Sequence, residues 1–183
     1  HMQAEYAVFI DGEDELAGKY ADICCVALSN IKQCYDEKFD RGNFVKNVIL
    51  DNILPGDIAI KARELRFNSD AVRTVLLIRI TEHNDSAAFD VIQNLFPDKT
   101  KDFVINENEI ALVKEVRSNI ETKDLEKLAR SISDSLTTDL YIHAYVGIGT
   151  TVTGVKELAR SFKEAQIALE VGKVFDTEKT IVS

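Results

Sequence analysis

The stretch KDFVINENEIALVKEV, residues 101–116, decides the fold. Residues 101–105 and residues 109–116 are predicted to form two strands, which Asn106-Glu107-Asn108 joins. A short link rich in asparagine predicts a β-hairpin, because asparagine tolerates positive φ. The predicted topology therefore has a hairpin at its centre.

The segments nearest to this hairpin are a strand and a helix before it and a helix after it. Residues 72–81 are rich in Val, Leu and Ile and predict a strand, and residues 86–96 predict a helix that Pro97 ends. Thr122 is expected to cap the following helix, whose apolar positions are Leu125, Leu128, Ala129, Ile132 and Leu136.

The rest of the chain adds two strands and one helix. Residues 140–148 predict a strand, and residues 180–182 predict an edge strand. Between them, residues 155–174 predict a helix with the apolar stripe Leu158, Phe162, Ala165 and Leu169. The order β-α-β-β-α-β-α-β predicts an α+β, ferredoxin-like fold, in which one helix and one strand extend a split βαβ core.

The predicted strand 140–148 has two unequal faces. Alternate residues point to opposite sides of a sheet, so one face carries apolar residues and is assigned to the core: Leu140, Ile142, Ala144, Val146 and Ile148. The other face carries Tyr141, His143, Tyr145 and Gly147. That face is either a binding surface or packed under a helix, and packing is preferred because aromatic residues are common in strands.

The N-terminal third of the sequence predicts a helical connector. Residues 6–10 are apolar and predict a strand that ends at Asp11-Gly12, so residues 1–12 are interpreted as a remnant of an upstream domain. Residues 13–70 form the connector, and a helix over residues 13–38 carries an apolar stripe close to a coiled-coil seam. The stripe consists of Leu16, Tyr20, Ile23, Ala27, Ile31 and Cys34.

Two breaks are expected within this connector. Residues 40–43 (DRGN) are expected to interrupt the first helix, and Pro55-Gly56 to stop the second, whose apolar positions are Phe44, Val48, Ile49 and Ile53. A third helical piece is expected over residues 57–66. The stripe of the first helix has two interpretations of equal weight, packing on the following domain or formation of a homodimer.

Composition limits the possible partners. The chain has 31 acidic and 22 basic residues, and the resulting formal net charge of −9 argues against broad nucleic-acid binding. No apolar run approaches the ~18 residues of a membrane span, and no signal peptide follows the opening His1-Met2, which resembles a cloning remnant.

Cysteine and histidine spacing predicts no metal site and no cofactor. Cys24, Cys25 and Cys34 form no Cys-x-x-Cys pair, so they are expected to be unpaired thiols, buried or facing a helix, in a reducing cytoplasm. Beyond the first residue, the histidines are His83 and His143, which are far apart in sequence.

A combination of short patterns resembles a known family. The strand sequence VGIG at residues 146–149 is followed by the helix pattern LARSFKEA at residues 158–165 and by Ala168-Leu169. Upstream, ILPG at residues 53–56 precedes KAREL at residues 61–65. Together these patterns resemble the GGDEF-like domain of the PucR/CdaR class of bacterial transcription regulators, which includes purine-catabolism and sugar-diacid regulators.

The resemblance covers roughly residues 44–183 and implies a place within a longer regulator. In this class a sensor domain usually precedes the GGDEF-like domain, and a helix-turn-helix domain for DNA binding follows it. The chain is therefore expected to be a cytoplasmic middle fragment, with residues 71–183 as its GGDEF-like domain. It is expected to reach DNA only through a C-terminal domain that this sequence does not contain.

The resemblance also implies that enzymatic activity has been lost. Related true GGDEF domains make cyclic di-GMP from two GTP molecules, which requires carboxylates to hold metal ions and two glycines at the hairpin tip. The metal-binding Asp-x-Asp corresponds here to Arg79-Ile80-Thr81, and a guanidinium cannot ligate Mg²⁺. The signature motif corresponds to Asn106-Glu107-Asn108-Glu109-Ile110, in which Glu109 is the acid that matches.

A shift in the assumed register changes one part of this comparison. A slip of one or two residues brings Glu82 or Asp85 near the metal position, but residues 90–120 contain no glycine to complete the tip. The sequence thus favours a non-enzymatic signalling and dimerisation module. The alternative is an effector-binding domain that uses Arg79, Tyr141, His143 and Tyr145, because guanidinium pairs with acids and aromatic rings stack.

Overall fold

The computed structural model describes residues 7–12, 14–81, 85–175 and 181–182. The chain divides into two compact units, His1–Asp40 and Arg41–Ser183. This division differs from the boundary predicted at residue 70. Residues 41–70 were assigned to the connector, but the buried side chains Phe44, Val45, Ile58 and Phe67 belong to the main core of the second unit.

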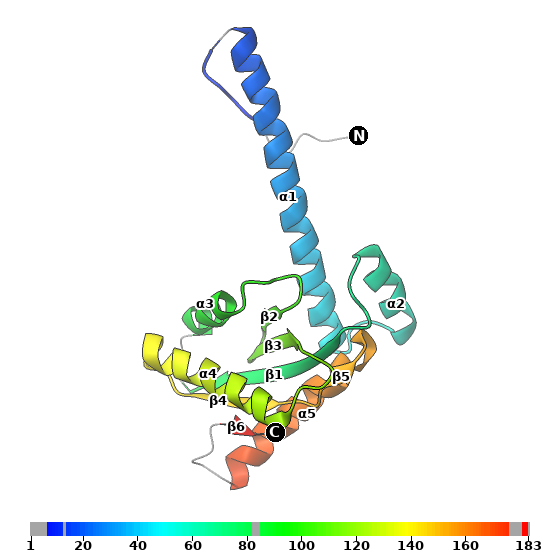
Figure 1. Ribbon diagram of the computed structural model, residues 1–183, viewed down its shortest axis with the longest axis vertical. Helices are drawn as coiled ribbons and strands as arrows, with labels where there is room; N and C mark the ends of the chain where they lie inside the picture. Colours follow the sequence, from blue (N-terminus) through cyan, green and yellow to red (C-terminus); the bar gives the residue numbers. More distant parts are fainter. Residues whose placement is uncertain (1–6, 13, 82–84, 176–180, 183) are drawn as a thin grey trace. The chain divides into compact units, whose positions relative to one another are not determined.

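The long helix α1 (Glu15–Ile49) makes up most of the first unit with its residues 15–40, drawn in blue in Figure 1, and its residues 41–49 belong to the second unit. The carboxylate of Asp14 accepts a 2.7 Å hydrogen bond from the amide of Ala17, which satisfies a free donor of the first turn. Residues 7–10 form no strand, contrary to prediction, because a strand needs a hydrogen-bonded neighbour; Tyr6 lies outside the described residues.

Helix α1 continues through residues 40–43, so the predicted interruption there was wrong. A glycine inside a helix costs about 1 kcal/mol relative to alanine, which is too little to break a helix that packing supports. The turns after Gly42 supply that packing, because Val45, Val48 and Ile49 are almost completely buried.

Helix α2 (Pro55–Glu64) begins at the proline that was predicted to stop a helix. Proline is favoured in the first turn because the amide that it lacks has no intrahelical partner there. Helix α1 instead ends at Ile49, and Asp51 then adopts φ 62. The Arg41 guanidinium donates a 3.0 Å hydrogen bond to the carbonyl of Leu65, just after α2.

The sheet confirms the predicted ferredoxin-like order. Its strands are β1 (Val72–Ile80), β2 (Phe103–Asn106), β3 (Ile110–Glu115), β4 (Ala144–Ile148), β5 (Val152–Thr153) and β6 (Ile181–Val182). The spatial order is β2-β3-β1-β4-β6, and β5 pairs with the start of β1. The pairs within β2-β3-β1-β4 are antiparallel, whereas β6 joins β4 in parallel.

Helices cover both faces of this sheet (Figure 1). Helices α3 (Asp85–Leu95) and α4 (Thr122–Leu140) pack on one face, against strand residues such as Leu76, Ile78 and Val146. The end of α1, together with α2 and α5 (Leu158–Phe175), packs on the other face, against Val75 and Leu77. Because β1 is buried on both faces, its middle, residues 75–78, is continuously apolar.

Three local predictions near α4 and the hairpin need correction. Thr122 is the first residue of α4 and not its cap; Glu121 holds that position and makes no side-chain capping bond. The strand predicted from residue 140 begins at Ala144, because α4 extends to Leu140 and Tyr141 ends it in the left-handed region with φ 58. The hairpin forms, but neither Asn106 nor Asn108 is among the described residues with positive φ.

Candidate functional site

The tip of the β2–β3 hairpin is a short, closed loop. Asn106 pairs with Ile110, and the amide of Glu107 donates a 3.2 Å hydrogen bond to the carbonyl of Glu109. Glu107 and Asn108 are exposed, whereas Glu109 is half-buried. Of the two carboxylates in the loop, that of Glu109 is therefore the less exposed.

Arg79, near the end of β1, receives that carboxylate. Its guanidinium forms an ion pair with Glu109, and a second pair with Glu170 of α5 has an N–O distance of 2.6 Å. Burial alone would lower the pKa of Arg79, but the hydrogen bonds and charges of Glu170 and Glu109 outweigh burial and raise it. Arg79 is thus a permanent cation that joins the hairpin to α5.

The structure brings only some of the aromatic residues of the candidate site close to Arg79. Tyr145 is the direct cross-strand partner of Arg79, and Thr81 donates a 3.4 Å hydrogen bond to the carbonyl of His143. Tyr141 lies outside the strand, at the end of α4. Because all three aromatic side chains are exposed, the preferred interpretation that they pack under a helix was wrong.

Gly147, on the same face as these aromatic residues, does lie under a helix. A Cβ atom built there would stand 2.4 Å from the carbonyl oxygen of Ala165, and one built on Gly149 would stand 2.0 Å from that of Ser161. Real Cβ contacts essentially never fall below 3.0 Å. Both glycines are therefore required by the close approach of α5 to the strand backbone.

Ser161 also completes the hydrogen bonding of the sheet at this contact. Three residues, 149–151, lie opposite two residues of β1, Thr74 and Val75, between the pairs Leu76–Ile148 and Arg73–Val152. The Ser161 hydroxyl accepts a 3.1 Å hydrogen bond from the buried amide of Val75. A helix side chain thus supplies the partner that the bulged ladder does not provide.

The sequence model of the GGDEF-like domain family matches residues 51–171. The chain belongs to this family. A search among curated proteins found no match. The matched region contains the hairpin, Arg79, the two close-packed glycines and most of α5, so the features described above all lie within the GGDEF-like domain.

The residues of this GGDEF-like domain at the hairpin do not fit a Mg²⁺ site. A metal ion would need several carboxylate oxygens, but the Glu109 carboxylate is already paired with the guanidinium of Arg79. Asp85 begins α3, and Glu82 lies outside the described residues. In the described ranges, no group of three or more His, Cys, Asp or Glu residues is arranged to hold a metal ion.

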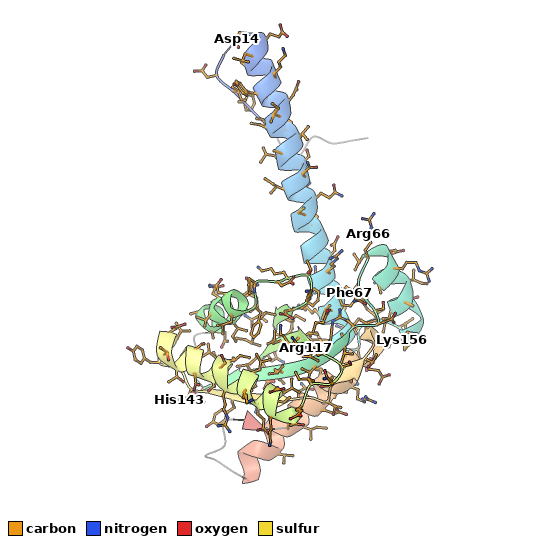
Figure 2. All side chains as sticks on the ribbon, in the orientation of Figure 1. Asp14, Arg66, Phe67, Arg117, His143 and Lys156 are labelled. Atoms are coloured by element: carbon orange, nitrogen blue, oxygen red, sulfur yellow. The ribbon has the colours of Figure 1, made fainter. Side chains whose placement is uncertain are left out.

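A second charged cluster, which sequence reasoning missed, lies at the other end of β1. Arg73 is only 1% exposed; it donates a 2.9 Å hydrogen bond to the carbonyl of Asn68 and pairs with Glu115 at 3.3 Å. Its guanidinium lies 4.6 Å from the ring centre of Phe67, which is labelled in Figure 2. Burial lowers the pKa of Arg73, while the charges of Glu115 and Asp102 oppose that shift.

The role of the Arg73 cluster is structural. The Phe67 ring stands 5.3 Å from that of Phe44 in α1 and 5.5 Å from that of Phe103 in β2. Arg73 therefore fixes the segment after α2 against the sheet. An arginine inside a run of Val, Leu and Ile was the signal in the sequence, because a charge at a core position needs buried partners.

The apolar stripe on α1 is exposed. Leu16, Tyr20, Ile23 and Ile31 have 53–63% of their surface accessible, and Ala27 is exposed as well. The three cysteines are unpaired, as predicted, but they lie exposed on this helix and are not buried. No helix in the described part of the chain has the length and apolar character needed to cross a membrane.

Proposed function

We propose that this chain is the non-enzymatic signalling and dimerisation module of a cytoplasmic bacterial transcription regulator of the PucR/CdaR class. In such a regulator it would link an upstream sensor to a downstream helix-turn-helix domain, which would make the contact with DNA. One observation carries the proposal. Helix α1 runs without a break from an exposed apolar stripe to residues buried in the core of the GGDEF-like domain.

A second copy of α1 is the partner that best suits the spacing of the apolar stripe. Leu16, Tyr20, Ile23 and Ala27 follow steps of four, three and four, which is the spacing of a two-stranded coiled-coil seam. Four or more large apolar side chains on one exposed face leave a contiguous surface that a second copy of α1 would bury.

We expect the purified chain to form a homodimer. Static light scattering at increasing protein concentration checks this, because a weak coiled coil gives a mass that rises from 20.5 kDa toward twice that value. A mass that stays at the monomer value up to millimolar chain would contradict the dimerisation proposal.

We also expect no cyclic dinucleotide when the chain is incubated with GTP and Mg²⁺. The cation of Arg79 repels Mg²⁺ from the position that active enzymes use, and the hairpin lacks the glycines that let a nucleotide approach. Separation of the products by chromatography is the measurement. Formation of cyclic di-GMP above the level of a heat-denatured sample would overturn the non-enzymatic part of the proposal.

An effector-binding role is the second candidate, and the pairing of Tyr145 with Arg79 is the observation in its favour. The ion pairs of Arg79 argue against an acidic effector, because the cation already has two carboxylate partners. A flat, uncharged nucleobase that stacks on Tyr145 suits the site better. A thermal-shift screen with purines and sugar diacids distinguishes them, with Tyr145→Ala as the variant that should lose any purine effect.

A further inference from the structure

The hairpin also contacts α1, through an ion pair at its other carboxylate. Lys46 lies in the last turn of α1 and pairs with Glu107. Both side chains are part-exposed, at 40% and 37%. The contact lies within the second unit, where the end of α1 belongs to the core.

The two ends of the hairpin loop therefore hold different helices. Glu107 holds α1 through Lys46, while Glu109 holds Arg79, which in turn holds Glu170 of α5. Glu107 and Glu109 are joined by their own backbone hydrogen bond, so a displacement of one is passed to the other. Glu109 is only 15% exposed, and its pair with Arg79 is accordingly less screened by water than the outer pairs.

We propose that the β2–β3 hairpin is an electrostatic tether that couples the end of α1 to the C-terminal half of α5. A displacement of the C-terminal end of α1 would move Glu107 and, through the hairpin, Glu109. The ion pairs that Arg79 makes with Glu109 and Glu170 would then change. The proposal rests on the signalling role inferred above for its biological purpose, but the coupling itself is a property of this domain alone. Such coupling would be a mechanical role for a hairpin whose sequence departs from the catalytic motif of GGDEF enzymes.

A second ion pair offers a direct comparison. Lys163, near the start of α5, pairs with Asp51, just after α1, at 2.7 Å. Both side chains are about 60% exposed, so this is a surface ion pair. This pair links α5 to the residues just after α1 without involving the hairpin. Removing it should leave the hairpin amides unaffected, whereas removing the Lys46 pair should not.

Amide hydrogen exchange on the full chain tests the tether. We expect Lys46→Met and Glu107→Gln each to speed exchange of residues 166–171 in α5 by about two- to fivefold, the range that the loss of one surface ion pair allows. Because the two changes break the same pair, combining them should give no further increase. Lys163→Met is the matched control and should leave exchange of residues 103–110 unchanged.

Two outcomes would overturn the tether. One is an effect of Lys46→Met that stops at the hairpin and leaves residues 166–171 unchanged. The other is an equal increase throughout, including residues 125–136 of α4 on the opposite face, because that indicates general destabilisation. The dimerisation proposal is judged separately by light scattering: a monomer with coupled exchange refutes dimerisation alone, and a dimer with uncoupled exchange refutes the tether alone.

Discussion

Replacing Gly149 with alanine is expected to lower the free energy of unfolding by about 2–4 kcal/mol. The new methyl group would stand 2.0 Å from the carbonyl oxygen of Ser161 and 2.7 Å from its hydroxyl, so α5 has to move away from the strand. That movement also stretches the hydrogen bond from the buried Val75 amide to Ser161. Urea denaturation followed by circular dichroism measures the loss.

Gly42→Ala is the matched control for this prediction. Gly42 lies inside α1, and a Cβ atom there would meet nothing within 4 Å. The same substitution should therefore stabilise the protein by about 0.4–1 kcal/mol, because alanine is the better helix former. A Gly149→Ala variant with a free energy of unfolding within about 0.5 kcal/mol of the parent would show that α5 does not pack tightly against the strand at this position.

The patterns VGIG and LARSFKEA, on which the resemblance to the family was based, are thus in part packing patterns. Gly147 and Gly149 remove side chains from the strand, while Ser161 and Ala165 place small residues on the helix turn above them. These four residues bring α5 close to the sheet and say little about chemistry.

Apolar periodicity predicted the order of the main strands and helices of the GGDEF-like domain because each of them must turn apolar side chains toward the core. The strands β1 to β4 lie between two helix-covered faces, and the helices present apolar stripes to the sheet. The ends of elements were less predictable. Alternation of buried residues continues through Ile142, although that residue lies outside β4, so the pattern alone placed the strand start too early.

The charged contacts of the candidate site could be predicted only in part. The comparison with the family singled out Arg79 and Glu109 separately and predicted no contact between them, but the structure joins them in an ion pair. Glu170 is 91 residues from Arg79 in the chain, and no local pattern marks such a pair. The predicted helix break at residues 40–43 was wrong for a similar reason. The free-energy cost of Gly42 in a helix is a local property, whereas the packing that outweighs this cost involves distant strands.

Ile23→Glu is expected to weaken self-association of the chain at least about 100-fold. In a dimer that buries the stripe of Leu16, Tyr20, Ile23, Ala27 and Ile31, each copy would bring one carboxylate into the apolar seam. The two carboxylates would lose water without gaining a partner and would repel one another. Sedimentation equilibrium over a wide concentration range gives the dissociation constants of the parent and the variant.

Ser29→Glu separates this effect from a general effect of charge. Ser29 is exposed on the same helix and lies about 120° around it from Ile23, on the side away from the stripe. Both variants change the net charge from −9 by one unit, so long-range repulsion is the same in both. If both weaken association equally, the stripe is not the seam. A large loss for Ile23→Glu with near-parental association for Ser29→Glu assigns the dimer contact to the stripe.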